Sequence, residues 1–225
     1  MSKKTATRAA PHASGPSRTT ALRADARRNQ EEILRSARDL FIERGIDVPL
    51  DEVARRAGVG IGTLYRRFRD RDALVKAVLI EALEQSRASA RGARVAHEGN
   101  GLDAVARYLR EMLDVRVSAV IPLALDRLDD PDLEVAREAS AGEVERLIDE
   151  AHEDGSLSQE VTFGDLGTLL VRLSRPLPGP MTAAADNRLA HRHLDLVLAG
   201  LRGGAAGLRE KGLTRQQLGG LGRES

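Results

Sequence analysis

The chain has 225 residues, of which 31% are charged and 2% aromatic, and it contains no cysteine, which excludes disulfides and thiolate metal sites. No apolar run reaches the roughly 20 residues that a membrane span needs, and the basic start lacks the apolar segment of a secretory signal. We therefore expect a soluble, cytoplasmic protein with no membrane partner. The net charge of +1 is unevenly distributed, because residues 1–80 carry 17 Lys and Arg against 10 Asp and Glu, whereas residues 81–225 carry 18 against 24. A basic N-terminal part followed by an acidic remainder favours a phosphate-binding module attached to a non-binding body.

The first residues are rich in Ser, Thr, Ala, Pro and Arg and show no apolar period, so residues 1–26 are predicted to be a disordered basic arm. This arm is also an alternative explanation of the N-terminal charge, since residues 1–30 carry 7 basic residues and 1 acidic residue. Order is expected to begin near Asn29, which together with Glu32 fits a capping box. An apolar stripe from Ile33 to Phe41 then predicts a helix that ends at Gly45.

Residues 50–68, LDEVARRAGVGIGTLYRRF, predict two short helices joined by a tight turn. Apolar residues recur at helical spacing on both sides of Gly58, which stands where a chain leaving a helix often needs a positive φ. The rings of Tyr65 and Phe68 are predicted to lie in the core, which leaves only the Tyr65 hydroxyl accessible. Asp70 suits the N-cap of a further helix that runs toward Ser86. This pattern is typical of a helix-turn-helix whose second helix enters the major groove of DNA.

The segment from Ile33 to about Leu83 resembles the DNA-binding domain of the tetracycline-repressor (TetR) family of bacterial transcriptional regulators. The resemblance covers about a quarter of the chain. It is carried by short runs at fixed spacing: Leu40-Phe41, Val53-Ala54, Ala57-Gly58-Val59, Gly62-Thr63-Leu64-Tyr65 and Phe68. It implies double-stranded DNA as a partner.

Candidate DNA-contacting residues lie in these helices and at the start of the next one: Arg55, Gly60, Ile61, Gly62, Thr63, Tyr65, Arg66, Arg67 and Arg71. The resemblance implies phosphate contacts from the hydroxyls of Thr63 and Tyr65 and from Arg71, contacts that set position rather than sequence preference. The two glycines, Ile61 and Arg66 occupy the part of the helix nearest the base edges, and Arg66 is the first candidate for reading a guanine. A solvated cluster of arginines is the alternative interpretation.

Residues 87–202 are predicted to form a second, all-helical domain. After a polar connection over residues 87–101, apolar stripes predict helices over residues 102–113, 117–127, 131–154, 163–173 and 190–201. Residues 203–225 hold seven glycines and are predicted to be a flexible tail, although four leucines leave room for a short docked segment. The predicted fold is therefore all-α, with an N-terminal three-helix helix-turn-helix DNA-binding domain over residues 27–86 and a larger C-terminal helical bundle domain for ligand binding and dimerisation.

The resemblance implies that the last two helices pair with those of a second copy in a four-helix bundle. A homodimer would place two reading helices about 34 Å apart, so the operator is expected to be an inverted repeat. Packing within one chain is the alternative explanation of the apolar stripes on these helices.

The resemblance also implies an unknown small-molecule effector that binds inside the C-terminal bundle. Its candidate lining residues are Met112, Leu123, Leu169 and Arg172. For the three apolar residues, packing in the core is the competing interpretation. The near absence of aromatic residues beyond the fourth helix argues against an aromatic-lined cavity.

Enzyme and metal functions find no support in the sequence. The chain has no phosphate-binding glycine loop, nucleophile elbow or zinc motif. His191, His193 and Asp195 are spaced two apart, so on a helix they point to different faces and cannot converge on a metal. We therefore expect no catalytic residue, no metal and no cofactor. The sequence predicts a transcriptional regulator, expected to repress, that a small molecule releases from DNA; the alternative is a helical ligand-binding or adaptor protein with a vestigial DNA-binding head.

Overall fold

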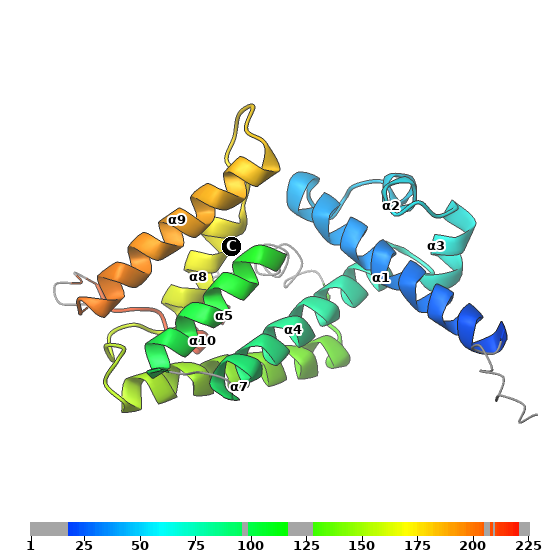
Figure 1. Ribbon diagram of the computed structural model, residues 1–225. Coiled ribbons are helices and arrows are strands. Elements are labelled where there is room, and N and C mark those ends of the chain that lie inside the picture. Colours follow the sequence, from blue (N-terminus) through cyan, green and yellow to red (C-terminus); the bar gives the residue numbers. More distant parts are fainter. Residues whose placement is uncertain (1–17, 96–98, 117–127, 205–207, 209, 221–225) are drawn as a thin grey trace, which may run out of the picture.

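The computed structural model describes residues 18–95, 99–116, 128–204, 208 and 210–220, and these residues form helices joined by turns, with no strand among them (Figure 1). The helices are α1 (Arg18–Arg44), α2 (Leu50–Arg56), α3 (Ile61–Arg67), α4 (Arg71–Val95), α5 (Gly101–Val115), α7 (Pro131–Glu153), α8 (Phe163–Ser174), α9 (Ala183–Arg202) and α10 (Arg215–Gly220). The all-α prediction is confirmed. None of these helices is long and apolar enough to cross a membrane. The helix expected over residues 117–127 lies outside the described residues.

Helix α1 begins earlier than its sequence suggests. It starts at Arg18, so Asn29 is an exposed residue inside the helix and the prediction that order begins there is wrong. No glycine or proline stands between Pro16 and Arg44, so nothing interrupts the helix upstream of the apolar stripe. Residues 18–26 of the expected arm are therefore helical, and residues 1–17 lie outside the described residues. The end of α1 is as predicted, because Gly45 follows with a φ of +85°.

Helix α4 connects the two halves of the molecule. It ends at Val95 rather than at Ser86, so the expected polar connection is mostly helix. Its first half contributes residues such as Leu74 to an N-terminal core, whereas Ala90 and Ala93 near its end are fully buried in a C-terminal core. The boundary expected between residues 86 and 87 therefore falls within one continuous helix.

The N-terminal core is formed by the four helices α1, α2, α3 and α4. Helix α7 adds a residue to it. Ile33 and Phe41 of α1 and Leu64 of α3 are fully buried in this core. Leu133, from the first turn of α7, is only 4% exposed in the same core. On the surface beside it, the Nζ of Lys76 lies 2.7 Å from a carboxylate oxygen of Asp130 and 2.8 Å from one of Asp132. Residues of the C-terminal half thus belong to the core of the DNA-binding half.

The C-terminal core is formed by α5, α7, α8 and α9. The stripe predicted for α5 is buried along its full length: Leu102, Val105, Ala106, Leu109, Met112 and Leu113. The long helix α7 ends as predicted, and Gly155 follows with a φ of +71°. Helix α8 begins with a capping box formed by Thr162 and Asp165.

A ladder of polar side-chain pairs joins α5 and the residue that follows it to α9, which runs antiparallel to α5. Its rungs are Asp103–Arg202 at 2.5 Å, Arg110–Asp195 at 2.9 Å, Asp114–His191 at 2.7 Å and Arg116–Asp186 at 2.7 Å. His191 and Asp195, which sequence spacing had already separated, thus belong to different rungs.

The C-terminal segment folds back onto the bundle. The Oγ1 of Thr162 donates a hydrogen bond of 2.8 Å to the carbonyl oxygen of Leu213, and Arg215 forms ion pairs with Glu138 and Glu145 of α7. A Cβ added to Gly164 would lie 2.1 Å from the same carbonyl oxygen, so the contact is close. Within the tail predicted to be flexible over residues 203–225, the structure thus places Leu213 and Arg215 against the bundle. The docked segment was foreseen only as an option because leucine spacing alone does not show what a segment contacts.

Candidate DNA interface

Helices α2 and α3 are joined by the tight turn that the sequence predicted. Pro49 stands at the N-cap of α2 with a φ of −58°, and Asp51 and Glu52 lie in the first turn, where the helix dipole favours carboxylates. Gly58 adopts a φ of +65°, which L-residues with a side chain rarely adopt. The backbone N–H of Val59 donates to the carbonyl oxygen of Ala54 at 3.0 Å and closes the turn. The helix-turn-helix is thus confirmed.

Helix α3 has one buried face and one exposed face. Leu64 is fully buried and Phe68, four residues later, is nearly so. Ile61 and Tyr65 form the other i, i+4 pair and are 39% and 50% exposed. The prediction that the Tyr65 ring lies in the core is therefore wrong. Four apolar residues in eight positions cover more than one face of a helix, and their spacing does not show which pair is buried.

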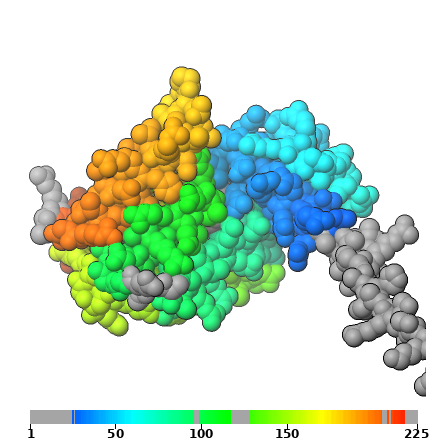
Figure 2. All heavy atoms as spheres, in the orientation of Figure 1, coloured from blue at the N-terminus to red at the C-terminus, as the bar shows by residue number. Residues whose placement is uncertain are grey.

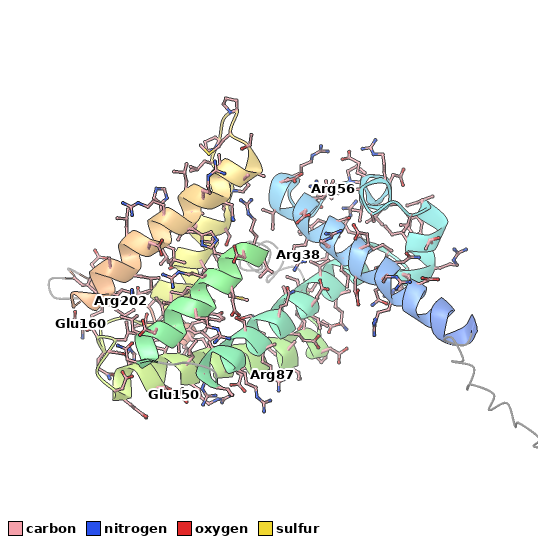
Figure 3. All side chains as sticks on the ribbon, viewed as in Figure 1. Arg38, Arg56, Arg87, Glu150, Glu160 and Arg202 are labelled. Carbon is pink, nitrogen blue, oxygen red and sulfur yellow. The ribbon has the colours of Figure 1, made fainter. Side chains whose placement is uncertain are left out.

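One arginine of α2 holds this helix against α1. The guanidinium of Arg56 donates two hydrogen bonds, of 2.7 and 2.8 Å, to the two carboxylate oxygens of Glu43 (Figure 3). These bonds lower the pKa of Glu43 and raise the pKa of Arg56. Arg44 pairs with Glu52 across the same two helices. Such pairs fix orientation more than they add stability, because the side chains are partly exposed.

Arg71 has a scaffolding role that the sequence did not indicate. Its Nη1 donates to the carbonyl oxygens of Ile46 and Val48, at 2.8 and 2.5 Å, and so ties the start of α4 to the loop between α1 and α2. Backbone carbonyls are present at every residue, so no residue pattern could have predicted this contact. The phosphate contact expected of Arg71 would have to use its other N–H groups.

The remaining candidate residues lie on the surface around α3. The Nη2 of Arg66 donates to the Oγ1 of Thr63 at 2.9 Å, and Arg55 and Arg67 are exposed. Gly60 and Gly62 adopt ordinary backbone angles, and a Cβ added to either would meet no atom within 4 Å. Packing within the chain therefore gives no reason for glycine at these two positions.

Comparison with known proteins identifies the family. Residues 33–78 match the bacterial regulatory proteins of the tetR family, and residues 101–203 match the C-terminal domain of SbtR-like transcriptional regulators. The crystal structure of a TetR transcription regulatory protein from Mycobacterium vanbaalenii is 30% identical, with 80% of this chain and 99% of that chain covered at a TM-score of 0.53. The chain belongs to the TetR family.

Two further relatives are also transcriptional regulators. The TetR transcriptional regulator of Streptomyces coelicolor is 29% identical over 77% of this chain and 98% of that chain, with a TM-score of 0.55. An HTH-type transcriptional regulator of Staphylococcus aureus is 36% identical over 64 residues, which are 28% of this chain and 35% of the relative. The chain thus matches about a third of the length of these curated relatives. Membership identifies a DNA-binding, helix-turn-helix regulator of transcription.

The effector candidates of this TetR-family chain do not share one environment. Met112 is buried in the C-terminal core, and Leu169 is partly buried against it. Arg172 lies at the surface of α8, and Leu123 lies outside the described residues. Of the three candidates that the structure describes, two thus belong to the C-terminal core and one to the surface.

The apolar stripe of α9 faces the interior of this TetR-family chain. Ala190, Leu194 and Leu198 are buried in the chain's own core, which is the alternative that the sequence left open for this stripe. Leu189 and Leu196 are instead exposed, at 38% and 55%, and lie seven residues apart on one face. An apolar stripe in the sequence does not show whether the chain itself or a second copy covers it.

Proposed function

We propose that the protein represses transcription by binding an inverted-repeat operator as a homodimer, and that a small-molecule effector releases it. The observation that carries the proposal is the outer face of α3, where Ile61 and Tyr65 are exposed one turn apart. A helix that presents an aliphatic residue, an aromatic hydroxyl and nearby arginines suits thymine methyl groups, phosphates and guanine edges.

Two glycines beside these residues support the same proposal. Gly62 costs the helix about 1 kcal/mol relative to alanine. Nothing within the chain requires a glycine at this position, because there is open space for a side chain. Gly60, just before the helix, is equally open. Glycine at the leading edge of α3 would let the backbone approach a duplex closely.

The DNA-binding part of the proposal is tested by selecting bound fragments from the source genome and measuring the affinities of variants on them. Arg66→Ala should relax the preference at one base pair and cost about 1 to 3 kcal/mol on the selected site. Tyr65→Phe should weaken binding to selected and random duplexes alike, because it removes a phosphate contact.

Tyr108→Phe is the matched control, since Tyr108 is the only other tyrosine and its hydroxyl lies in the C-terminal half, 3.0 Å from the Ser86 Oγ. It should leave DNA affinity unchanged. If selection enriched no fragment, the vestigial-head alternative would be favoured. Equal losses on selected and random DNA for Arg66→Ala would assign that residue to the phosphate backbone.

The exposed leucines of α9 support the homodimer. Leu189 and Leu196 together form an apolar face on one of the two helices that the family resemblance assigns to the seam. Replacing both leucines by aspartate should convert the dimer to a monomer in analytical ultracentrifugation and reduce operator affinity. Val135→Asp on α7 is the control, because this valine is 69% exposed and lies on another helix. A wild-type protein that sediments as a monomer at tens of micromolar would contradict the proposal.

The effector must bind the DNA-incompetent state more tightly than the competent one, or it cannot shift the equilibrium. A TetR-like regulator of Mycobacterium smegmatis, LfrR, has been solved in complex with proflavine and is 21% identical, with a TM-score of 0.62. In this chain the aromatic residues beyond α4 are Tyr108 and Phe163, so we propose an aliphatic rather than a planar aromatic effector. Proflavine should therefore leave the protein on its selected DNA, and its release by proflavine would contradict this choice.

A further inference from the structure

The outer face of α9 carries an exposed arginine between two exposed leucines. Helix α9 lies uncovered along one side of the C-terminal half (Figure 2). Its buried residues face the chain's own core, which leaves Leu189 and Leu196 exposed on the opposite side. Arg192 is exposed three residues after Leu189 and four before Leu196, so helical spacing places all three on one face. Arg188, one turn before Arg192, is exposed beside this face.

These two arginines have no acidic neighbour on the outer face of α9. Neither forms an ion pair with the residues that the structure describes. Helices α8 and α9 and the loop between them contain three aspartates, and each is held within its own chain: Asp165 in the capping box of α8, Asp186 by Arg116 and Asp195 by Arg110. Asp186 is also only 5% exposed. The positive charge of this face therefore has no counterpart within the described part of the chain.

A homodimer that joins two copies of α9 concentrates this charge. A two-fold interface uses the same surface on both copies. In an interface that includes Leu189 and Leu196 of both chains, the residues midway between them lie nearest the two-fold axis and meet their own counterparts. Arg192 is the charged residue at this midpoint, so two guanidinium groups come together there, with Arg188 of each chain beside them. Like charges in an interface oppose association unless an anion lies between them.

We propose that the outer face of α9 binds a doubly charged oxyanion such as phosphate at the two-fold axis, held by Arg192 of both copies, and that this anion strengthens the dimer. The inference rests on the homodimer of the proposed function. A guanidinium donates two parallel N–H bonds to a pair of phosphate oxygens, and a tetrahedral anion offers one such pair to each of two opposed guanidiniums. Helices α9 and α3 lie at opposite ends of the molecule, so this anion is not a phosphate of the DNA that α3 contacts (Figure 1).

Analytical ultracentrifugation of the full chain tests the effect of phosphate on the dimer. The dissociation constant of the dimer is measured with and without sodium phosphate, at the same pH and at an ionic strength kept constant with NaCl. By linkage, phosphate at about nine times its own dissociation constant tightens the dimer about tenfold. We expect about this tightening at roughly 10 mM phosphate. Isothermal titration calorimetry should give one phosphate bound for every two chains.

Arg192→Ala should abolish the response to phosphate and give a dimer of the same strength in both buffers. The residue is exposed and alanine favours a helix, so circular dichroism should show a folded variant. Phosphate also strengthens apolar contacts in general, but that effect would persist in Arg192→Ala, which keeps both leucines. The matched control is Arg137→Ala on α7, which removes the same charge from an arginine that pairs with Glu134 within its own helix. It should keep the full response.

The outcomes separate this inference from the proposed function. A wild-type dimer of equal strength in both buffers would overturn the inference and leave the proposed homodimer intact. A full phosphate response in Arg192→Ala would also overturn it, because phosphate would then act elsewhere on the protein. Binding of one phosphate to every chain would contradict a site on the two-fold axis. A wild-type protein that is monomeric in both buffers would overturn the proposed homodimer as well.

Discussion

Leu133→Ala should destabilise the DNA-binding half although the residue belongs to α7. Leu133 is 4% exposed and lies in the same core as Ile33, Phe41 and Leu64. The substitution keeps a helix-forming residue in the first turn of α7, so its effect comes from the core and not from helix propensity.

The expected magnitude follows from the atoms removed. Leucine to alanine deletes three carbon groups, each contributing about 0.8 kcal/mol when buried, and the remaining cavity adds to the loss. We expect the free energy of unfolding to fall by about 2.5 to 4 kcal/mol. Val135→Ala, two residues further along α7, should change it by less than about 0.5 kcal/mol, because that side chain is 69% exposed.

Urea denaturation at fixed protein concentration measures the total loss in the free energy of unfolding, and amide hydrogen exchange shows which helices lose protection. Protection should fall in α1, α2 and α3 as well as at the start of α7. A loss under about 1 kcal/mol, or a loss of protection confined to α7, α8 and α9, would refute the assignment of Leu133 to the core of the DNA-binding half.

Three further substitutions test other parts of the structure. Gly164→Ala should undock residues 210–217, because its Cβ would lie 2.1 Å from the carbonyl oxygen of Leu213. Limited proteolysis should then cleave this segment. The control is Gly167→Ala, which has open space for its Cβ and should leave the segment docked. Gly58→Ala should lower the free energy of unfolding by about 1 to 2 kcal/mol, because this residue has a φ of +65°; an unchanged denaturation midpoint would contradict this. Burial raises the pKa of Glu81, so its carboxyl contributes stability at low pH that is lost as the pH rises through that pKa. Glu81→Gln should therefore be more stable than the wild type at about pH 7, with the difference shrinking toward about pH 4, and the opposite trend would contradict this reasoning.

The sequence predicted the helices best where apolar residues are large and regularly spaced. The stripe of α5 and the turn at Gly58 are present as expected. Prediction failed at the start of α1 and the end of α4, where the helices continue through alanine and charged residues. Ala90 and Ala93 are buried, but alanine is also common on helix surfaces, so it gave no apolar signal.

The sequence predicted where the candidate site lies, but it did not predict the roles of the individual side chains. The sequence located the reading helix, yet it could not separate the exposed Tyr65 from the buried Phe68. Nor could it show that Arg56 and Arg71 hold the scaffold together, since both roles depend on partners distant in sequence: Glu43 and a pair of backbone carbonyls. Tertiary contacts, rather than local pattern, decide which arginines face outward.

The ion pairs between α5 and α9 fix the register of the two helices. Charges alternate along α5, so a slide of α9 by one turn, about 5.4 Å, would bring His191 toward Arg110. A slide of two turns would set Asp103 against Asp195 and break both of their present pairs. Sliding therefore breaks the present pairs, and a slide of two turns also brings two carboxylates together, whereas a joint tilt of both helices keeps every rung. A tilt of α5 that keeps these pairs would then move α9 with it.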